Sequence, residues 1–198
     1  MIKRLYLFDF DGTITKKDSF IDFFLQTFGY RHLLIVIIKN LPKVLSLIIR
    51  RDLGKLKEFL TSIFLIKKNE VVLFKLGNNY LNNHFDELMN SVAVEEILRL
   101  QKNKENTLFI VSASLDLWLS HFAKKLKVKL ICTQLEYKNE TFTGNFKTKN
   151  CKGHEKVSRI KQVLSLEDFN EIIVYGDSDG DKEMLQLGTK TFYKPFRE

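Results

Sequence analysis

The chain has 198 residues, of which 44% are hydrophobic and 28% are charged. This length fits one domain, or one domain with a sizeable insertion. Nine glycines and two prolines are too few for a collagen-like or low-complexity chain, and the apolar content excludes a disordered one. The only cysteines, Cys132 and Cys151, cannot form a disulfide framework and match no zinc-binding spacing. We therefore expect a reducing, cytoplasmic setting.

The formal net charge of +8 is concentrated in residues 30–60, which hold seven lysines and arginines against two acidic residues. Such a segment suits nucleic acid, an anionic membrane surface or an anionic substrate, and it can also be a solvated helix face. Nucleic acid is disfavoured because the interleaved residues are aliphatic rather than aromatic. Asp9 interrupts the first apolar run too early for a signal peptide, and the apolar stretch 33–49 carries two lysines. We expect a soluble protein.

Three short apolar runs, at residues 2–8, 108–111 and 172–175, predict buried strands. Each run is apolar on both alternating faces, as in a central parallel strand that helices cover on both sides. Helical spacing of apolar residues appears between and after these runs. The alternation predicts an α/β fold with a doubly wound parallel sheet.

Two segments depart from that alternation. Residues 18–90 show helical runs without a strand pattern, which predicts a small inserted helical cap. Residues 133–137 and 141–146 flank a polar turn and predict a β-hairpin. The expected division is a catalytic core of residues 1–17 and 91–198 with a cap of residues 18–90. The helical runs of the cap are expected to break near four residues, namely Gly29, Pro42, Gly54 and Gly77.

Polar residues follow each of the three predicted strands. The first strand runs into Asp9 and Asp11, the second into Ser112, and the third into Asp177 and Asp181. Because ligands of open parallel sheets bind beyond the carboxyl ends of the strands, these side chains should meet at one edge. A single Asp-rich turn is usually an ordinary polar loop, but three clusters at one edge favour a functional site.

The four aspartates at this edge would repel one another strongly unless a cation lay among them. Carboxylates are hard oxygen ligands that suit Mg²⁺, with water and a substrate phosphate completing the coordination. The loop after residue 176 lacks the spacing of an EF-hand, and the chain has no Walker or dinucleotide-binding glycine pattern. This layout points to phosphoryl transfer.

The segment DFDGT at residues 9–13 resembles the first motif of the haloacid-dehalogenase-like phosphohydrolases. Ser112, which follows a strand, resembles the second motif, and Lys156 the lysine of the third. Asp177 and Asp181 resemble the fourth motif. The insert between the first two motifs is similar to the helical C1 cap of subfamily IB, which includes phosphoserine phosphatase. The resemblance spans nearly the whole chain.

This resemblance implies a phosphomonoester hydrolase that works through an aspartyl-phosphate intermediate. Asp9 would be the nucleophile, and Asp11 would protonate the leaving oxygen and then deprotonate the attacking water. Mg²⁺ would bind the carboxylates of Asp9 and Asp177 and the main-chain carbonyl of Asp11. Asp181 would stand behind them and orient water or Lys156.

The resemblance also implies the residues that hold the phosphate oxygens. These would be Lys156, Ser112 and backbone N–H groups near Gly12 and Ala113. Lys152 competes with Lys156 for this role, and the motif spacing favours Lys156. Asp18 falls where phosphoserine phosphatases have a glutamate that helps to hold the substrate. It fits a helix N-cap equally well.

The substrate is expected to be a phosphorylated small molecule or a lipid. Gly180, the sequence Ser-Ala-Ser at residues 112–114 and the lack of a matching cap arginine depart from phosphoserine phosphatase. The third motif, CKGHEK at residues 151–156, and the basic apolar cap are similar to the branch containing phosphatidylglycerophosphatase C. The resemblance therefore favours a head-group phosphate such as phosphatidylglycerophosphate. Phosphoserine or another small metabolite is the alternative.

Residues 32–60 alternate aliphatic runs with arginine and lysine. As amphipathic helices they could lie against an anionic membrane at its cytoplasmic face, or they could pack the cap's own core. A remote alternative is a non-catalytic basic protein that binds membranes peripherally, which the full set of catalytic residue types disfavours. The sequence carries no indication of an oligomeric state.

Overall fold

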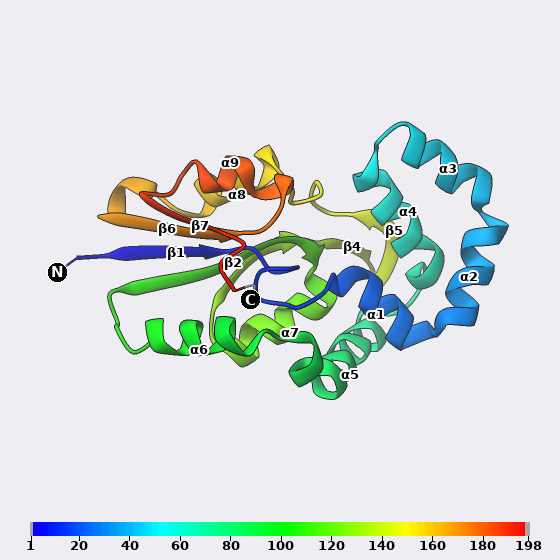
Figure 1. The fold of residues 1–198 in the computed structure, drawn as a ribbon. Helices are drawn as coiled ribbons and strands as arrows, with labels where there is room; N and C mark the ends of the chain where they lie inside the picture. Colours follow the sequence, from blue (N-terminus) through cyan, green and yellow to red (C-terminus); the bar gives the residue numbers. More distant parts are fainter. Residues whose placement is uncertain (1, 197–198) are drawn as a thin grey trace.

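The computed structural model describes residues 2–196, which form a parallel sheet between two layers of helices with a helical cap at one end (Figure 1). The five strands lie in the order β3-β2-β1-β6-β7, and every neighbouring pair is parallel. The predicted doubly wound α/β fold is therefore confirmed. The strands are β1 (Arg4–Phe8), β2 (Asn106–Leu115), β3 (Lys129–Thr133), β6 (Glu171–Gly176) and β7 (Lys190–Tyr193).

The central strand β1 shows why helices cover both faces of the sheet. Tyr6 and Phe8 belong to a core cluster that includes residues of α6 and α7. Leu5 and Leu7, on the opposite face, belong to a second cluster with residues of α8 and α9. Because side chains alternate along a strand, a run that is apolar at every position is buried on both sides. The flanking helices are α6 (Ser91–Leu100), α7 (Asp116–Leu126), α8 (His154–Val163) and α9 (Lys182–Leu185).

The helices between β1 and α6 form the cap, which lies at the carboxyl ends of the strands (Figure 1). Helix α1 begins after Asp18, whose carboxylate accepts hydrogen bonds from the N–H groups of Phe20 and Ile21 at 2.8 and 3.1 Å. Gly29, at φ +80°, ends α1. The cap helices are α1 (Ser19–Phe28), α2 (Tyr30–Lys39), α3 (Leu41–Ile49), α4 (Leu53–Leu65) and α5 (Glu70–Leu88).

Gly77 does not break a helix, so that prediction is wrong. It lies in the middle of α5, where this helix crosses α7 of the core. A Cβ atom at this position would lie 1.9 Å from the main-chain oxygen of Leu117. Only glycine allows so close an approach of two helices. The division of the chain into a core of residues 1–17 and 91–198 and a cap of residues 18–90 stays a prediction.

The antiparallel hairpin consists of β4 (Leu135–Lys138) and β5 (Thr141–Phe146). Its predicted first arm began too early, because Thr133 belongs to β3 of the main sheet. Strand β5 also joins the cap: Lys67 N donates to the carbonyl of Phe142 at 3.1 Å, and Phe142 N donates to the carbonyl of Lys68 at 3.0 Å. The hairpin therefore ties the end of α4 to the core.

Within residues 2–196, none of the helices is by itself long and apolar enough to span a membrane. Helices α1 and α2 pass that test only as a pair, and they are bent by 107° where they meet.

Candidate active site

The carboxyl ends of β1, β2 and β6 open into a cavity of about 510 Å³ between the sheet and the cap. All eight residues that the sequence analysis placed in the site line this cavity, namely Asp9, Asp11, Gly12, Ser112, Ala113, Lys156, Asp177 and Asp181. The cap contributes Asp18, Leu53 and Lys57 to the opposite wall. The structure thus brings the predicted residues together at one edge of the sheet.

Lys156 lies at the centre of this edge and is only 2% exposed. Its Nζ atom lies 2.5 Å from Asp9 Oδ1 and 2.6 Å from Asp181 Oδ1, and it donates to the carbonyl of Val111 at 2.7 Å. Burial disfavours the ammonium form, but the two carboxylates outweigh burial and raise the pKa of Lys156 above its ordinary value. Lys156 is therefore a fixed cation beside Asp9.

Asp181 holds Lys156 with one carboxylate oxygen and the following loop with the other. Its Oδ2 atom accepts hydrogen bonds from Asp177 N at 3.2 Å and from the N–H and hydroxyl groups of Ser178 at 3.1 and 2.9 Å. Burial favours the neutral acid, yet Lys156 and Ser178 together hold the pKa of Asp181 below its ordinary value. Since both oxygens are engaged, Asp181 fits the predicted orienting role.

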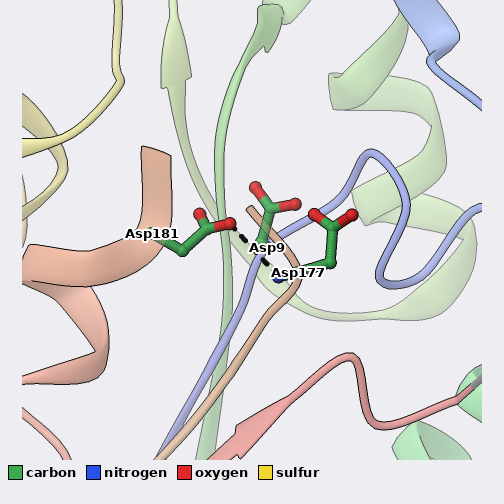
Figure 2. A group of neighbouring side chains, drawn as sticks. All are labelled: Asp9, Asp177 and Asp181. Atoms are coloured by element: carbon green, nitrogen blue, oxygen red, sulfur yellow. Dashed lines mark hydrogen bonds between the residues drawn. The ribbon is translucent and has the colours of Figure 1, made fainter. Parts of the chain in front are cut away.

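The carboxylates of Asp9, Asp177 and Asp181 converge, and one oxygen of each lies within 4.8 Å of the others (Figure 2). Gly12 makes room for this approach, because its φ is +77° and a Cβ atom would lie 2.4 Å from Asp177 Oδ2. Burial raises the pKa of Asp9 to about 7, although Lys156 acts in the opposite direction. The ionised form of Asp9 therefore costs free energy in this buried position unless further positive charge is present.

The carboxylate of Asp11 points away from this cluster and toward the cap. Its Oδ1 atom accepts from Ser19 N, the first residue of α1, at 2.7 Å, and its Oδ2 atom accepts from the hydroxyl of Ser114 at 2.5 Å. Burial and then the negative charge of Asp18 raise the pKa of Asp11. This environment favours the protonated acid, as a proton donor requires. Sequence reasoning had assigned no role to Ser19 and Ser114.

The residues predicted to hold phosphate oxygens stand at the floor of the cavity. Ser112 is buried, and its oxygen accepts a hydrogen bond from Ser114 N at 3.0 Å, a bond that does not use the hydroxyl proton of Ser112. The N–H of Gly12 donates to the hydroxyl oxygen of Thr15 at 3.1 Å. The phosphate-binding roles of Gly12, Ser112 and Ala113 stay predictions.

Lys57 of α4 is a cavity residue that the sequence analysis missed. Its Nζ atom donates to the carbonyl of Ala113 at 3.1 Å and lies 4.8 Å from the centroid of the Phe20 ring. A local signal was present: Lys57 lies four and eight residues before Thr61 and Leu65, which are fully buried on the inner side of α4. A lysine in register with a buried helix stripe is unusual and indicates a site.

Lys152 and Lys156, the two lysines that compete for the phosphate-binding role, differ in burial. Lys152 is exposed at the mouth, where its side chain packs beside Gly180, whereas Lys156 is buried. The structure therefore places Lys156 next to Asp9, and the prediction that Lys156 rather than Lys152 holds the phosphate stays a prediction. Burial lowers the pKa of Lys57, and the negative charge of Asp11 opposes that shift without cancelling it.

Four further residues, namely Trp118, His154, Cys132 and Cys151, do not line the cavity. Trp118 is fully buried and donates from its ring nitrogen to the hydroxyl oxygen of Ser19 at 3.0 Å. His154 is exposed and begins α8. Burial raises the pKa of both Cys132 and Cys151, that of Cys151 to about 11, so both thiols stay protonated at neutral pH.

The chain matches the family model of the haloacid dehalogenase-like hydrolases over residues 6–186. It is 31% identical over 195 residues to Protein CicA of Caulobacter vibrioides, an alignment that covers 98% of this chain and 86% of that protein. Among solved structures, a protein of unknown function from Bordetella pertussis Tohama I has a TM-score of 0.81 at 24% identity and covers 96% of this chain and 89% of its own.

A phosphoserine phosphatase in its apo form has a TM-score of 0.65 at 18% identity, over 96% of this chain and 86% of that one. At such identities the likeness shows a shared fold. The family match supports the predicted hydrolase. On the family model and on its identity to Protein CicA, this chain belongs to the haloacid dehalogenase-like hydrolase family.

Proposed function

We propose that the protein is a Mg²⁺-dependent phosphomonoesterase with Asp9 as its nucleophile. The observation that supports this most is the buried pair of Asp9 and Lys156, with Nζ 2.5 Å from Oδ1, at the floor of an open cavity. A carboxylate attacks phosphorus well only when the negative charge of the phosphate oxygens is offset, and Lys156 supplies a fixed positive charge there.

The reaction would proceed in two steps. Asp9 attacks phosphorus, so that a bond forms between its carboxylate oxygen and phosphorus while the ester bond to the leaving oxygen breaks. Asp11 gives its proton to that leaving oxygen, and the alcohol departs. A water molecule, deprotonated by Asp11, then attacks phosphorus, releases inorganic phosphate and regenerates the Asp9 carboxylate. The raised pKa of Asp11 suits both halves of this cycle.

The donors at the strand edge fit Mg²⁺, because they are hard oxygen ligands and because Asp9 is buried among too few positive charges. Asp9 and Asp177 would hold the ion together with the main-chain carbonyl of Asp11. Asp181 would stay outside this set, since its two oxygens already accept from Lys156 and from the loop after β6. When bound, the ion supplies positive charge that polarises a phosphate oxygen and neutralises developing negative charge.

The decisive experiment follows phosphate release from a generic aryl phosphate with Mg²⁺ and with EDTA, and then traps the intermediate. We expect activity only with Mg²⁺, and acid quenching followed by peptide mass spectrometry should find phosphate on Asp9. Asp9→Asn should be inactive, and Asp168→Asn, at an exposed position in a short 3₁₀ helix, is its matched control. Activity that survives EDTA, or phosphate found on another residue, contradicts the proposal.

For the substrate we propose a lipid head-group phosphate such as phosphatidylglycerophosphate. Within the described residues, every basic side chain that lines the cavity is a lysine, so no arginine fork is present for a carboxylate. The cap wall offers Lys57 to a second anionic group, and Leu53, 53% exposed, places apolar surface in the same wall. An acyl-bearing phosphate can use both features.

Phosphoserine is the competing substrate, since one similar structure is described as a substrate-bound phosphoserine phosphatase complex. Phosphate release from both compounds, with the lipid in mixed micelles, separates them. We expect kcat/KM to favour the lipid by about a hundredfold, which corresponds to about 2.7 kcal/mol of transition-state discrimination. A preference of that size for phosphoserine would overturn the lipid proposal and leave the phosphatase proposal intact.

A further inference from the structure

Helices α2 and α3 carry apolar side chains on the side that faces away from the protein. Among the described residues, nine of the twenty exposed large apolar side chains fall within residues 30–53. Ile49 is 80% exposed, Ile38 60% and Ile35 50%. We call this surface the outer face of the cap, and define it by six residues, namely Ile35, Ile38, Leu41, Leu45, Ile48 and Ile49.

Burial of the cap's own core does not account for the outer face. Val36, Val44 and Leu47 already fill the inward side of the same two helices and are less than a tenth exposed. The two helices are therefore apolar on opposite sides. A helix of that composition is normally covered all round, and an exposed apolar surface of this kind marks an interaction site.

The charge around the outer face has one sign. Residues 30–51 contain no acidic residue, and their five basic side chains are all exposed. Two copies joined through this face would bring their cations together, which opposes a symmetric dimer. An anionic lipid surface offers apolar depth together with negative charge, and it complements both features. The basic residues are Arg31, Lys39, Lys43, Arg50 and Arg51.

The outer face is also placed on the accessible side of the molecule. Figure 1 shows α2 and α3 at the end of the protein remote from β1. Just after α3, Arg50 and Arg51 lead the chain to Leu53 and Lys57, which line the active-site cavity. A surface that held α3 would therefore lie close to the mouth of that cavity.

From these observations we infer that the outer face of the cap docks the protein on an anionic membrane surface. Docking goes beyond the proposed hydrolysis, because it needs neither metal nor substrate. The apolar side chains of α2 and α3 enter the boundary between head groups and acyl chains, while the arginines and lysines around them contact anionic head groups.

Co-sedimentation of the full chain with vesicles of phosphatidylcholine alone, or of phosphatidylcholine with phosphatidylglycerol, tests the docking. We expect binding to the anionic vesicles only. The change Ile35→Ser/Ile38→Ser/Ile49→Ser should weaken it about tenfold or more. Val92→Ser/Leu98→Ser, at exposed positions on α6, is the matched control and should leave binding unchanged.

The charge contribution has its own variant. Lys39→Gln/Lys43→Gln/Arg50→Gln/Arg51→Gln should weaken binding about a hundredfold, since each cation near an anionic surface contributes separately. A second quadruple variant makes the same change in net charge at exposed lysines elsewhere and should bind like wild type. It consists of Lys102→Gln, Lys104→Gln, Lys124→Gln and Lys161→Gln.

Three outcomes would overturn the docking inference. They are equal binding to neutral and anionic vesicles, equal losses in the two quadruple variants, or wild-type protein that binds no vesicle and instead forms a dimer dissolved by the serine variant. Hydrolysis of a soluble aryl phosphate should stay at the wild-type level in all of these variants. Asp9→Asn should bind vesicles like wild type, so a failure of docking and a failure of the catalytic proposal are distinguishable.

Discussion

At the carboxyl ends of the strands Lys156 is 2% and Asp181 1% exposed, whereas Ile49 on the outer face of the cap is 80% exposed. One region buries charges, and the other leaves hydrocarbon in water. Both arrangements run against the usual distribution of side chains and cost free energy in the isolated protein. Under our proposals, Mg²⁺ would offset the negative charge at the strand edge, and an anionic lipid surface would cover the apolar side chains of the cap. The kind of partner that we propose for each region therefore follows from its unfavourable feature, buried charge at the strand edge and exposed hydrocarbon on the cap.

The largest effect in this comparison is expected when the buried nucleophile is removed. Asp9→Asn should lower the rate of aryl phosphate hydrolysis by about 10⁴-fold or more, because an amide cannot attack phosphorus. Initial rates of phosphate release with Mg²⁺ measure the effect, with Asp168→Asn as the control. Activity of the Asn variant within tenfold of wild type would remove Asp9 from its proposed role.

Removing the buried cation should destabilise the fold itself. Lys156→Met leaves Asp9 and Asp181 buried without their partner, and should lower the free energy of unfolding at pH 7 by about 3–5 kcal/mol. Because the pKa of Asp181 is lowered, its stabilising contribution is present above the ordinary value of 3.8 and is lost as the pH falls through the lowered pKa. Urea unfolding at pH 7 and at pH 3 should show that the difference in free energy of unfolding between wild type and Lys156→Met is smaller at pH 3. Lys161→Met, at an exposed position on α8, is the control.

Asp9 makes the opposite contribution to the pH dependence. Its pKa is raised from 3.8 to about 7, so the folded protein holds a proton that the unfolded chain releases. In EDTA, stability should therefore fall as the pH rises from 4 to 7, by up to about 4 kcal/mol. Asp9→Asn should remove this fall and exceed wild type in stability at pH 8. Parallel unfolding profiles of the two proteins would contradict the buried-charge explanation.

A smaller effect is expected at the cap wall of the cavity. Lys57→Gln should lower kcat/KM for the lipid phosphate about tenfold, the effect of losing about 1.4 kcal/mol of charge-assisted contact, and chiefly through KM. An aryl phosphate without a second anionic group should be affected less. Lys55→Gln, two residues away on an exposed part of the same helix, serves as the control. Equal losses for both substrates would show that Lys57 only shapes the cavity.

The smallest effect is expected on the outer face of the cap. Ile49→Ser should change the free energy of unfolding by less than about 0.5 kcal/mol, since the side chain contacts mainly solvent. Leu47→Ser in the same helix should lower it by about 3 kcal/mol, because Leu47 is 6% exposed. Urea unfolding of the two variants compares the faces of α3 directly. A large loss at Ile49 would mean that the outer face supports the fold.

Sequence patterns predicted the parts of the fold whose signal is local. Strands β1, β2 and β6 were found because their runs are buried on both faces. Strand β7 was missed, since its four residues are exposed and only two of them are aromatic. Thr133 was assigned to the hairpin because the polar turn after residue 137 is a stronger signal than the short apolar run of β3.

The candidate site divides in the same way. Asp9, Asp11, Asp177 and Asp181 could be named from their spacing after strands. Ser114, Ser19 and Lys57 could not, because their contacts join residues that are far apart in the chain, as between Lys57 and Ala113.

The glycine at position 77 has a thermodynamic meaning as well. Where it lies, the backbones of α5 and α7 touch, with no room even for a methyl group. The inserted segment and the sheet-bearing part of the chain share one core cluster, so we expect a loss of packing in either part to disrupt the other. Heating should therefore unfold the cap and the core in a single cooperative transition.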